Sequence, residues 1–167
     1  MPNTGATTFT GTINSGEITS TGDITGTNFK TSTTAGNEGG VIVTLTNGQG
    51  AIIPANRIVE IDKNTDNAID LTTTQGDDDV VGITTEACAI GGACKVMILG
   101  VTECLFDTGT VLSGRKVGSS STAGQCDMAY TSAASSDGWI GTTLEAKASG
   151  STGLVKVLIN GASYNNN

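Results

Sequence analysis

The chain has no histidine, and it is poor in aromatic and charged residues. Of its 167 residues, 4% are aromatic and 14% are charged. Without histidine, neither a Ser-His-Asp nor a Cys-His arrangement can form, and the usual general base at neutral pH is missing. Glu86 and Glu145 come nearest to a matched carboxylate pair, but they are equivalent positions of a repeat, which favours an equal structural role. We therefore predict that the protein is not an enzyme and needs no cofactor.

Long apolar runs are also missing. No stretch approaches the ~20 apolar residues of a membrane span. Residues 1–5 have neither the basic start nor the apolar run of a secretory signal, so we expect synthesis in a cytoplasm. The net charge of −8, from 16 acidic and 8 basic residues, repels phosphate backbones. We therefore expect no membrane partner and no nucleic-acid partner.

Metal ligands are scarce as well. The four cysteines, Cys88, Cys94, Cys104 and Cys126, form no CxxC pair, so a zinc site would need four thiolates at irregular spacing. Acidic turns at 62–66 and 77–79 contain possible calcium ligands, but the first lacks the glycine and the final glutamate of a calcium loop. Exposed acidic turns are the simpler interpretation of both. We predict no metal site.

The cysteines leave two interpretations open. Small buried thiols within strands are the one that we favour. A disulfide between Cys88 and Cys94 is the alternative, because these residues flank a turn and could face one another across it.

Glycine and threonine dominate what is present, with 24 and 28 residues. This composition favours short β-strands with tight turns and disfavours helices. Nine or ten strand candidates at spacings of eight to twelve residues predict a β-barrel or sandwich. Thr110–Leu112 and Arg115–Val117 flank Ser113-Gly114 and predict a tight hairpin. Because hydrophobic residues make up only 37%, we expect a thin core and stabilisation by oligomerisation.

One hairpin pattern occurs twice. Residues 81–100 read VGITTEACAIGGACKVMILG, and residues 140–161 read IGTTLEAKASGSTGLVKVLING. The first parts align at a separation of 59 residues and the second parts at 61, so the second copy has two extra turn residues. Such a repeat predicts a sheet built from modules.

Residues 1–40 differ from the rest, with 12 threonines, 8 glycines and four charges. We predict two regions: an extended Thr/Gly-rich N-terminal arm at 1–40 and a compact β domain at 41–167. The large apolar side chains of the arm are isolated from one another, namely Phe9, Ile13, Ile18, Ile24 and Phe29. They cannot form a core within one chain, whereas three copies wound together, or a partner surface, could bury them. A disordered leader is the alternative.

The runs VVGITTEA, GGACKVMILGV, GTVLSGRKV and WIGTTLEAKASGSTGLVKVLING, between about residues 57 and 161, resemble the capsid cement (head decoration) proteins of tailed phages. The resemblance implies a small β-barrel-like or β-tulip domain that forms a homotrimer on the outside of an icosahedral head. It also implies contact with the major capsid protein, synthesis in the host cytoplasm and a place in the virion. In that family the N-terminal segment often lies on the capsid and can add a strand to it.

The long arm and the four cysteines depart from the family pattern. The arm also resembles phage fibre shafts, so the alternative is a trimeric fibre or adhesin domain that binds a host surface glycan. Such a domain would show clustered aromatic residues, and this chain has one tryptophan and two tyrosines. Trp139 can anchor either a core or an interface. Capsid- or trimer-contact candidates are therefore the five apolar arm residues and Trp139.

Overall fold

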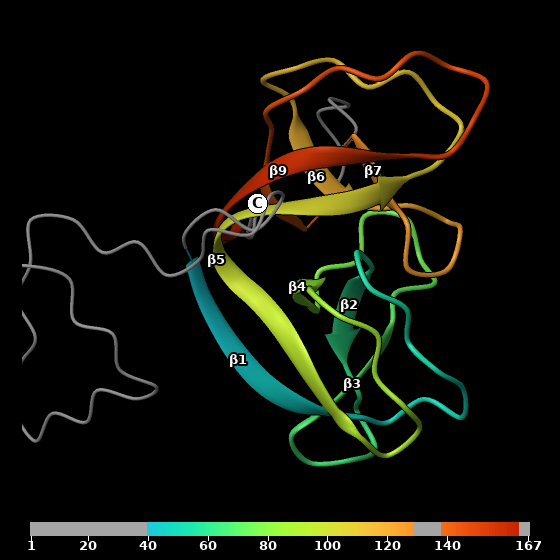
Figure 1. Ribbon diagram of the computed structural model, residues 1–167, viewed down its shortest axis with the longest axis vertical. Coiled ribbons are helices and arrows are strands. Elements are labelled where there is room, and N and C mark those ends of the chain that lie inside the picture. Colours follow the sequence, from blue (N-terminus) through green and yellow to red (C-terminus); the bar gives the residue numbers. More distant parts are fainter. Residues whose placement is uncertain (1–39, 129–137, 164–167) are drawn as a thin grey trace, which may run out of the picture.

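The computed structural model describes residues 40–128 and 138–163 (Figure 1). Within these two ranges the chain forms β-strands and no helix, which confirms the prediction of an all-β fold. None of the described segments is therefore a helix long and apolar enough to cross a membrane. The strands in chain order are β1 (Gly40–Asn47), β2 (Ile58–Ile61), β3 (Ala68–Leu71), β4 (Val80–Thr84), β5 (Ala93–Phe106), β6 (Lys116–Ser119), β7 (Cys126–Met128), β8 (Trp139–Thr143) and β9 (Gly153–Ser163).

The nine strands close into two rings that share β5. In the first ring the pairing order is β1-β3-β2-β4-β5, and β5 pairs back onto β1. In the second ring the order is β5-β7-β6-β8-β9, and β5 pairs back onto β9. Closure leaves few open strand edges within each ring.

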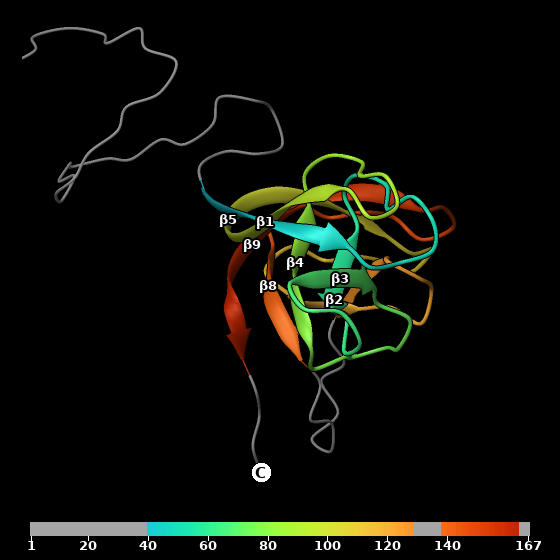
Figure 2. The same ribbon diagram turned by 90° about the horizontal axis from the view of Figure 1, so that it is seen from below.

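Strand β5 belongs to both rings because it bends near its middle (Figure 1). Its first half, Ala93–Gly100, pairs with β1, and its second half, Gly100–Phe106, pairs with β9. Gly100 lies at the change of partner with a φ of 117°, a conformation that side chains rarely permit. The two rings consequently lie next to each other, and β4 contacts both β8 and β9 (Figure 2).

The two repeated stretches form the hairpins β4–β5 and β8–β9, and their registers agree. Thr84 lies opposite Val96 in the first hairpin, and Thr143 lies opposite Val157 in the second. Gly82 and Gly141 are equivalent, and a Cβ atom on either would lie 2.2 Å from the carbonyl oxygen of Met97 or Leu158, respectively. Close approach of the backbones therefore explains the shared glycine.

The structural repeat extends beyond the two hairpins. The buried Thr84 hydroxyl donates to the Pro54 carbonyl oxygen at 2.8 Å and accepts the Arg57 amide at 3.0 Å. In the second ring the same two bonds measure 2.6 and 2.9 Å, and they join Thr143 to Leu112 and Arg115. Asn56 and Gly114 occupy equivalent turn positions, both with a positive φ (60° and 76°). Each ring is thus one copy of the same five-strand unit.

The hydrophobic core consists of two clusters of buried residues. The smaller one fills the first ring with Ile53, Val59, Ile69, Cys88, Cys94 and Val96. The larger one joins residues of the second ring, such as Phe106 and Val157, to Ile58, Ile83 and Met97 of the first. The first ring therefore contributes side chains to both clusters.

The predicted hairpin between Thr110–Leu112 and Arg115–Val117 is wrong. Val111 exchanges both backbone hydrogen bonds with Lys147, whereas Lys116 and Val117 pair with Thr142 and Gly141 of β8. The two segments therefore pair with β8 and the turn after it, and not with one another. Local pattern could not distinguish these cases, because both put a turn at Ser113-Gly114.

Candidate functional surface

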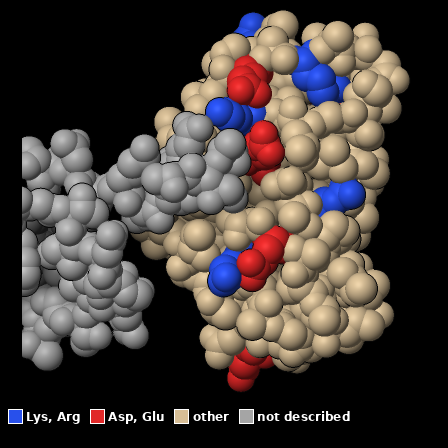
Figure 3. Space-filling model, in the orientation of Figure 1, with Lys and Arg blue, Asp and Glu red and all other residues tan. Residues whose placement is uncertain are grey.

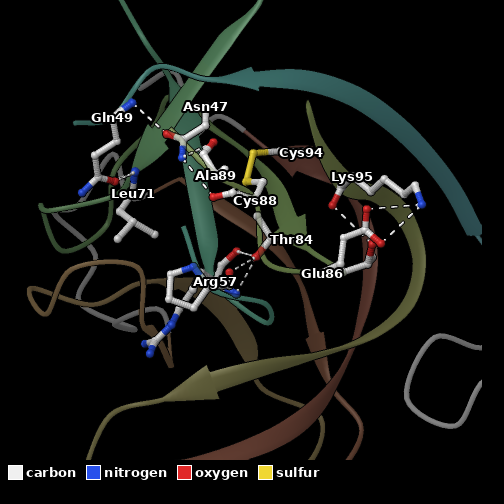
Figure 4. Close-up of a disulfide and its surroundings, with 12 residues drawn as sticks. Asn47, Gln49, Arg57, Leu71, Thr84, Glu86, Cys88, Ala89, Cys94 and Lys95 are labelled. Atoms are coloured by element: carbon white, nitrogen blue, oxygen red, sulfur yellow. Dashed lines mark hydrogen bonds and ion pairs between the residues drawn. A yellow bond between two sulfur atoms is a disulfide. The ribbon is translucent and has the colours of Figure 1, made fainter. Parts of the chain in front are cut away.

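The turn of the first repeated hairpin is held by a disulfide between Cys88 and Cys94, which have Cα atoms 5.2 Å apart (Figure 4). The buried amide of Asn47 donates to the carbonyl oxygens of Cys88 and Ala89 at 3.2 and 3.1 Å. On the exposed side of the same hairpin, Lys95 pairs with Glu86 at 3.3 Å. This turn is therefore fixed covalently and by a buried side chain.

Lys147 holds the equivalent turn of the second hairpin, at the position that corresponds to Cys88. Its ammonium group donates to three backbone carbonyl oxygens, those of Gly109 at 2.7 Å, Ser151 at 2.9 Å and Ala148 at 3.2 Å. The Lys147 ammonium, which has three donors, thus stabilises this turn as the disulfide stabilises the turn of the first hairpin.

A second disulfide joins Cys104 of β5 to Cys126 of β7, with Cα atoms 6.2 Å apart. All four cysteines are therefore paired, and the interpretation as buried free thiols is wrong. Strand register explains this pair, because Cys126 lies opposite Phe106, two residues beyond Cys104. The sequence could not reveal it, since four cysteines allow three connectivities.

Trp139 begins β8 and is half-buried. The Lys116 ammonium lies over its ring, 4.6 Å from the ring centre. This cation–π contact leaves part of the ring at the surface. The other five contact candidates, Phe9, Ile13, Ile18, Ile24 and Phe29, lie outside the described residues.

An acidic cluster lies between the first ring and β6. Glu60 of β2 is directly opposite Asp70 of β3. Loss of water around the Glu60 carboxyl, and then the hydrogen bond and charge of Asp77, raise the pKa of Glu60 to about 8. Lys63 pairs with Asp79 at 2.5 Å, and the Asp77 amide donates to the Ser119 hydroxyl. The carboxylates of residues 77–79 lie within 4.8 Å of one another.

The outward side of the second ring carries a group of apolar side chains, which we call the leucine face. On it Leu105 lies opposite Leu154, and Val101 lies opposite Leu158. Leu144 joins them because its amide donates to the carbonyl oxygen of Lys156, the residue between Leu154 and Leu158 on this side of β9. The leucine face thus consists of Val101, Leu105, Leu144, Leu154 and Leu158.

The leucine side chains of this face are exposed to solvent. Leu144, Leu154 and Leu158 are 44%, 48% and 38% exposed. Three charged residues interrupt it: Glu103 lies opposite Lys156 at its centre, and the carboxylate of Glu145, next to Leu144, accepts the Lys156 backbone amide at 3.4 Å. On the side of the molecule drawn in Figure 3, charged side chains are few and most of the surface is uncharged. Contiguous exposed apolar side chains of this kind mark interaction surfaces.

Sequence analysis missed the leucine face, although the repeat contains the signal. In an alignment of the two copies, Leu144 and Leu154 correspond to Thr85 and Ala93 of the first copy. Leucine at outward positions where the other copy has threonine or alanine marks a surface that differs in function.

Comparison with known proteins gives the family of this two-ring β protein. The chain matches the phage cement protein family over residues 37–159. It belongs to this family, which confirms the resemblance seen in the sequence. It is thus a structural protein of the phage virion, associated with the capsid.

The solved structures include a fold of the same kind. The N base of the head fiber gp8.5 in bacteriophage phi29 is similar to the chain with a TM-score of 0.52 and 15% sequence identity. The similarity covers 72% of this chain and 95% of that one, and it shows a shared fold. No curated protein matches the chain.

Proposed function

We propose that the protein binds the outside of an icosahedral phage head as a homotrimer and stabilises the capsid through contacts with the major capsid protein. The observation that carries this proposal is the family match across both rings. Each copy supplies a modest contact, and the symmetric copies on one head multiply it. The function is mechanical and involves no catalysis.

The N-terminal arm, residues 1–40, supplies the contact with the capsid in this proposal. Its apolar residues Phe9, Ile13, Ile18, Ile24 and Phe29 need a partner to be buried, and an extended segment can add a strand to the sheet of another protein. Trp139 is the candidate contact within the described domain, because part of its ring faces solvent.

A second candidate function is a trimeric fibre or adhesin domain that binds a host surface glycan. The observation that favours it is the fold shared with the base of a phage head fiber. The scarcity of aromatic side chains, which commonly stack on sugars, favours the cement function over this one.

The test is to mix the purified protein with expanded, undecorated heads of the phage that encodes it, both at full length and without residues 1–40. The cement function predicts saturable binding of three copies per local threefold position and a higher temperature of head disruption. Loss of binding with the arm would support the contact assigned to it, whereas binding that persists would move the contact to the β domain. Failure of the full-length protein to bind heads, combined with adherence to host cells, would favour the fibre.

A further inference from the structure

Three of the five members of the leucine face have no role in the fold of their own ring. The first ring has the same five-strand unit, so it shows which side chains the unit requires at the corresponding positions. There the equivalents of Leu105, Leu144 and Leu154 are small or polar, namely Thr46, Thr85 and Ala93, whereas those of Val101 and Leu158 are the apolar Ile42 and Met97. Because the first ring closes with Thr46, Thr85 and Ala93, the three leucines that replace them are not needed for closure. Their exposure requires another explanation.

Charge on the leucine face suits contact with an identical chain. Each copy carries a net charge of −8, so two copies repel one another unless their contact surface is close to neutral. The central charges, Glu103 and Lys156, sum to zero, Glu145 adds one negative charge beside Leu144, and the other members of the face are uncharged. A surface with so small a net charge buries apolar area against a second copy with little repulsion between like charges.

The position of the arm also indicates a second copy. The chain enters the β domain at Gly40, which pairs with Gly100, and Val101 of the leucine face follows directly on β5. Val41 and Leu99, both 48% exposed, lie opposite one another at this end. Copies that meet through the leucine face would therefore bring together the points at which their arms join the β domains. Arms that leave the trimer side by side can bury part of their isolated apolar residues against one another, in addition to the capsid contact proposed above.

From these observations we propose that the leucine face is the contact between subunits of the homotrimer. The contact places the three arm origins around one axis. This inference rests on the proposed homotrimer and assigns the surface that forms it.

The repeat itself supplies the variant for the test. Leu105→Thr/Leu144→Thr/Leu154→Ala replaces three members of the face by the residues of the first ring. Ile52→Thr/Ile61→Thr/Ile90→Ala is the matched control, because it removes three exposed apolar side chains (62%, 45% and 62%) from the first ring. Light scattering coupled to size exclusion, and native mass spectrometry, would measure the mass of each full-length protein over a hundredfold range of concentration.

The expected result is a mass of three chains for the wild type and the control, and 16.7 kDa, the mass of one chain, for the face variant. A face variant that remains trimeric like the wild type would overturn the proposal, as would a wild type that is monomeric throughout. Circular dichroism of the face variant checks that it is folded. If it is not, the double variant Leu154→Ala/Leu158→Ala, at two exposed positions, should still raise the trimer dissociation constant at least tenfold.

Binding to heads separates this inference from the proposed function. A wild type that binds heads while the face variant stays trimeric would leave the cement function standing and overturn only the assigned contact. A face variant that trimerises but no longer binds heads would indicate that the leucine face contacts the capsid protein, and would likewise overturn the proposal. Failure of the wild type to bind heads would count against the cement function alone.

Discussion

Lys147 and Cys88 occupy equivalent positions but hold their turns by different chemistry. The Lys147 ammonium donates hydrogen bonds to three backbone carbonyl oxygens. Hydrogen bonds from a charged donor are stronger than neutral ones, even where solvent reaches them in part. The residue is therefore a structural anchor, although its type suggests an ordinary surface cation.

We expect Lys147→Met to lower the free energy of unfolding by about 1–2 kcal/mol, because three carbonyl oxygens lose a charged donor. Urea denaturation measures this change. Lys95→Met is the control, since Lys95 forms an exposed ion pair with Glu86 that is worth less than about 1 kcal/mol. An equal effect of the two substitutions would contradict the anchoring role.

Glu60 makes the stability of the chain depend on pH. In the unfolded chain it ionises near its ordinary pKa of 4.5, whereas in the folded chain desolvation and Asp77 raise that pKa to about 8. Unfolding therefore releases a proton between these two pH values, and stability falls as the pH rises from about 4.5 to about 8. Below pH 4.5 the proton is bound in both states, and this contribution no longer changes.

Glu60→Gln should remove this fall, because the amide is uncharged at every pH. We expect the variant to exceed the wild type at pH 8 by on the order of 1 kcal/mol, a value reduced for screening by solvent. Denaturation at several pH values between 5 and 8 tests this, with the exposed neighbour substitution Asp78→Asn as the control for charge number. A wild-type stability that is constant over this range would refute the prediction.

The two disulfides close loops of different length. Cys104 and Cys126 are 22 residues apart, whereas Cys88 and Cys94 are 6 apart. A longer closed loop removes more entropy from the unfolded chain, which gives about 3 kcal/mol for the first bond and about 2 for the second. Both pairs are buried, so their removal also costs packing.

We therefore expect Cys104→Ala/Cys126→Ala to destabilise the protein more than Cys88→Ala/Cys94→Ala does. Guanidinium denaturation of both double variants under oxidising conditions measures the order. Reductant also opens the disulfides of the wild type. The difference in stability between the wild type and each double variant should therefore be smaller with reductant in the buffer. The reverse order would show that the hairpin turn, and not loop entropy, decides the contribution.

Sequence patterns indicated the elements better than their partners. The repeated stretches at 81–100 and 140–161 form hairpins as predicted, because alternation and glycines act locally. The partners of Val111 and Val117 were missed, since both segments pair with distant residues. The Cys104–Cys126 bond was missed for the same reason, because it depends on which strands become neighbours when the rings close. The leucine face could have been found by comparing the outward positions of the two copies.

The two rings form one cooperative unit, although the chain repeats itself. Met97 belongs to β5 within the first ring, yet its buried side chain packs in the cluster that fills the second. The first ring thus completes the core of the second, which has no closed core of its own. A duplication joined in this way should unfold in a single transition.

The substitution Met97→Ala tests this coupling between the rings, with the fluorescence of Trp139 as the probe. Trp139, the single tryptophan of the chain, lies on β8 in the second ring, so its fluorescence reports on the ring that does not contain the substitution. We expect Met97→Ala to lower the free energy of unfolding by about 2–4 kcal/mol. The unfolding midpoints measured by Trp139 fluorescence and by far-ultraviolet circular dichroism should fall together. Ile90→Ala, at an exposed turn position, should change both by less than about 0.5 kcal/mol.

All midpoints must be compared at one protein concentration, because assembly of subunits would make them depend on concentration. A fluorescence transition that stays at the wild-type midpoint, while the dichroism transition moves, would mean that the rings unfold independently. In that case the leucine face could be presented by a second ring that remains folded alone. Coincident transitions would instead mean that each subunit contact on the second ring depends on the packing of the first, so that the whole chain is the unit that assembles.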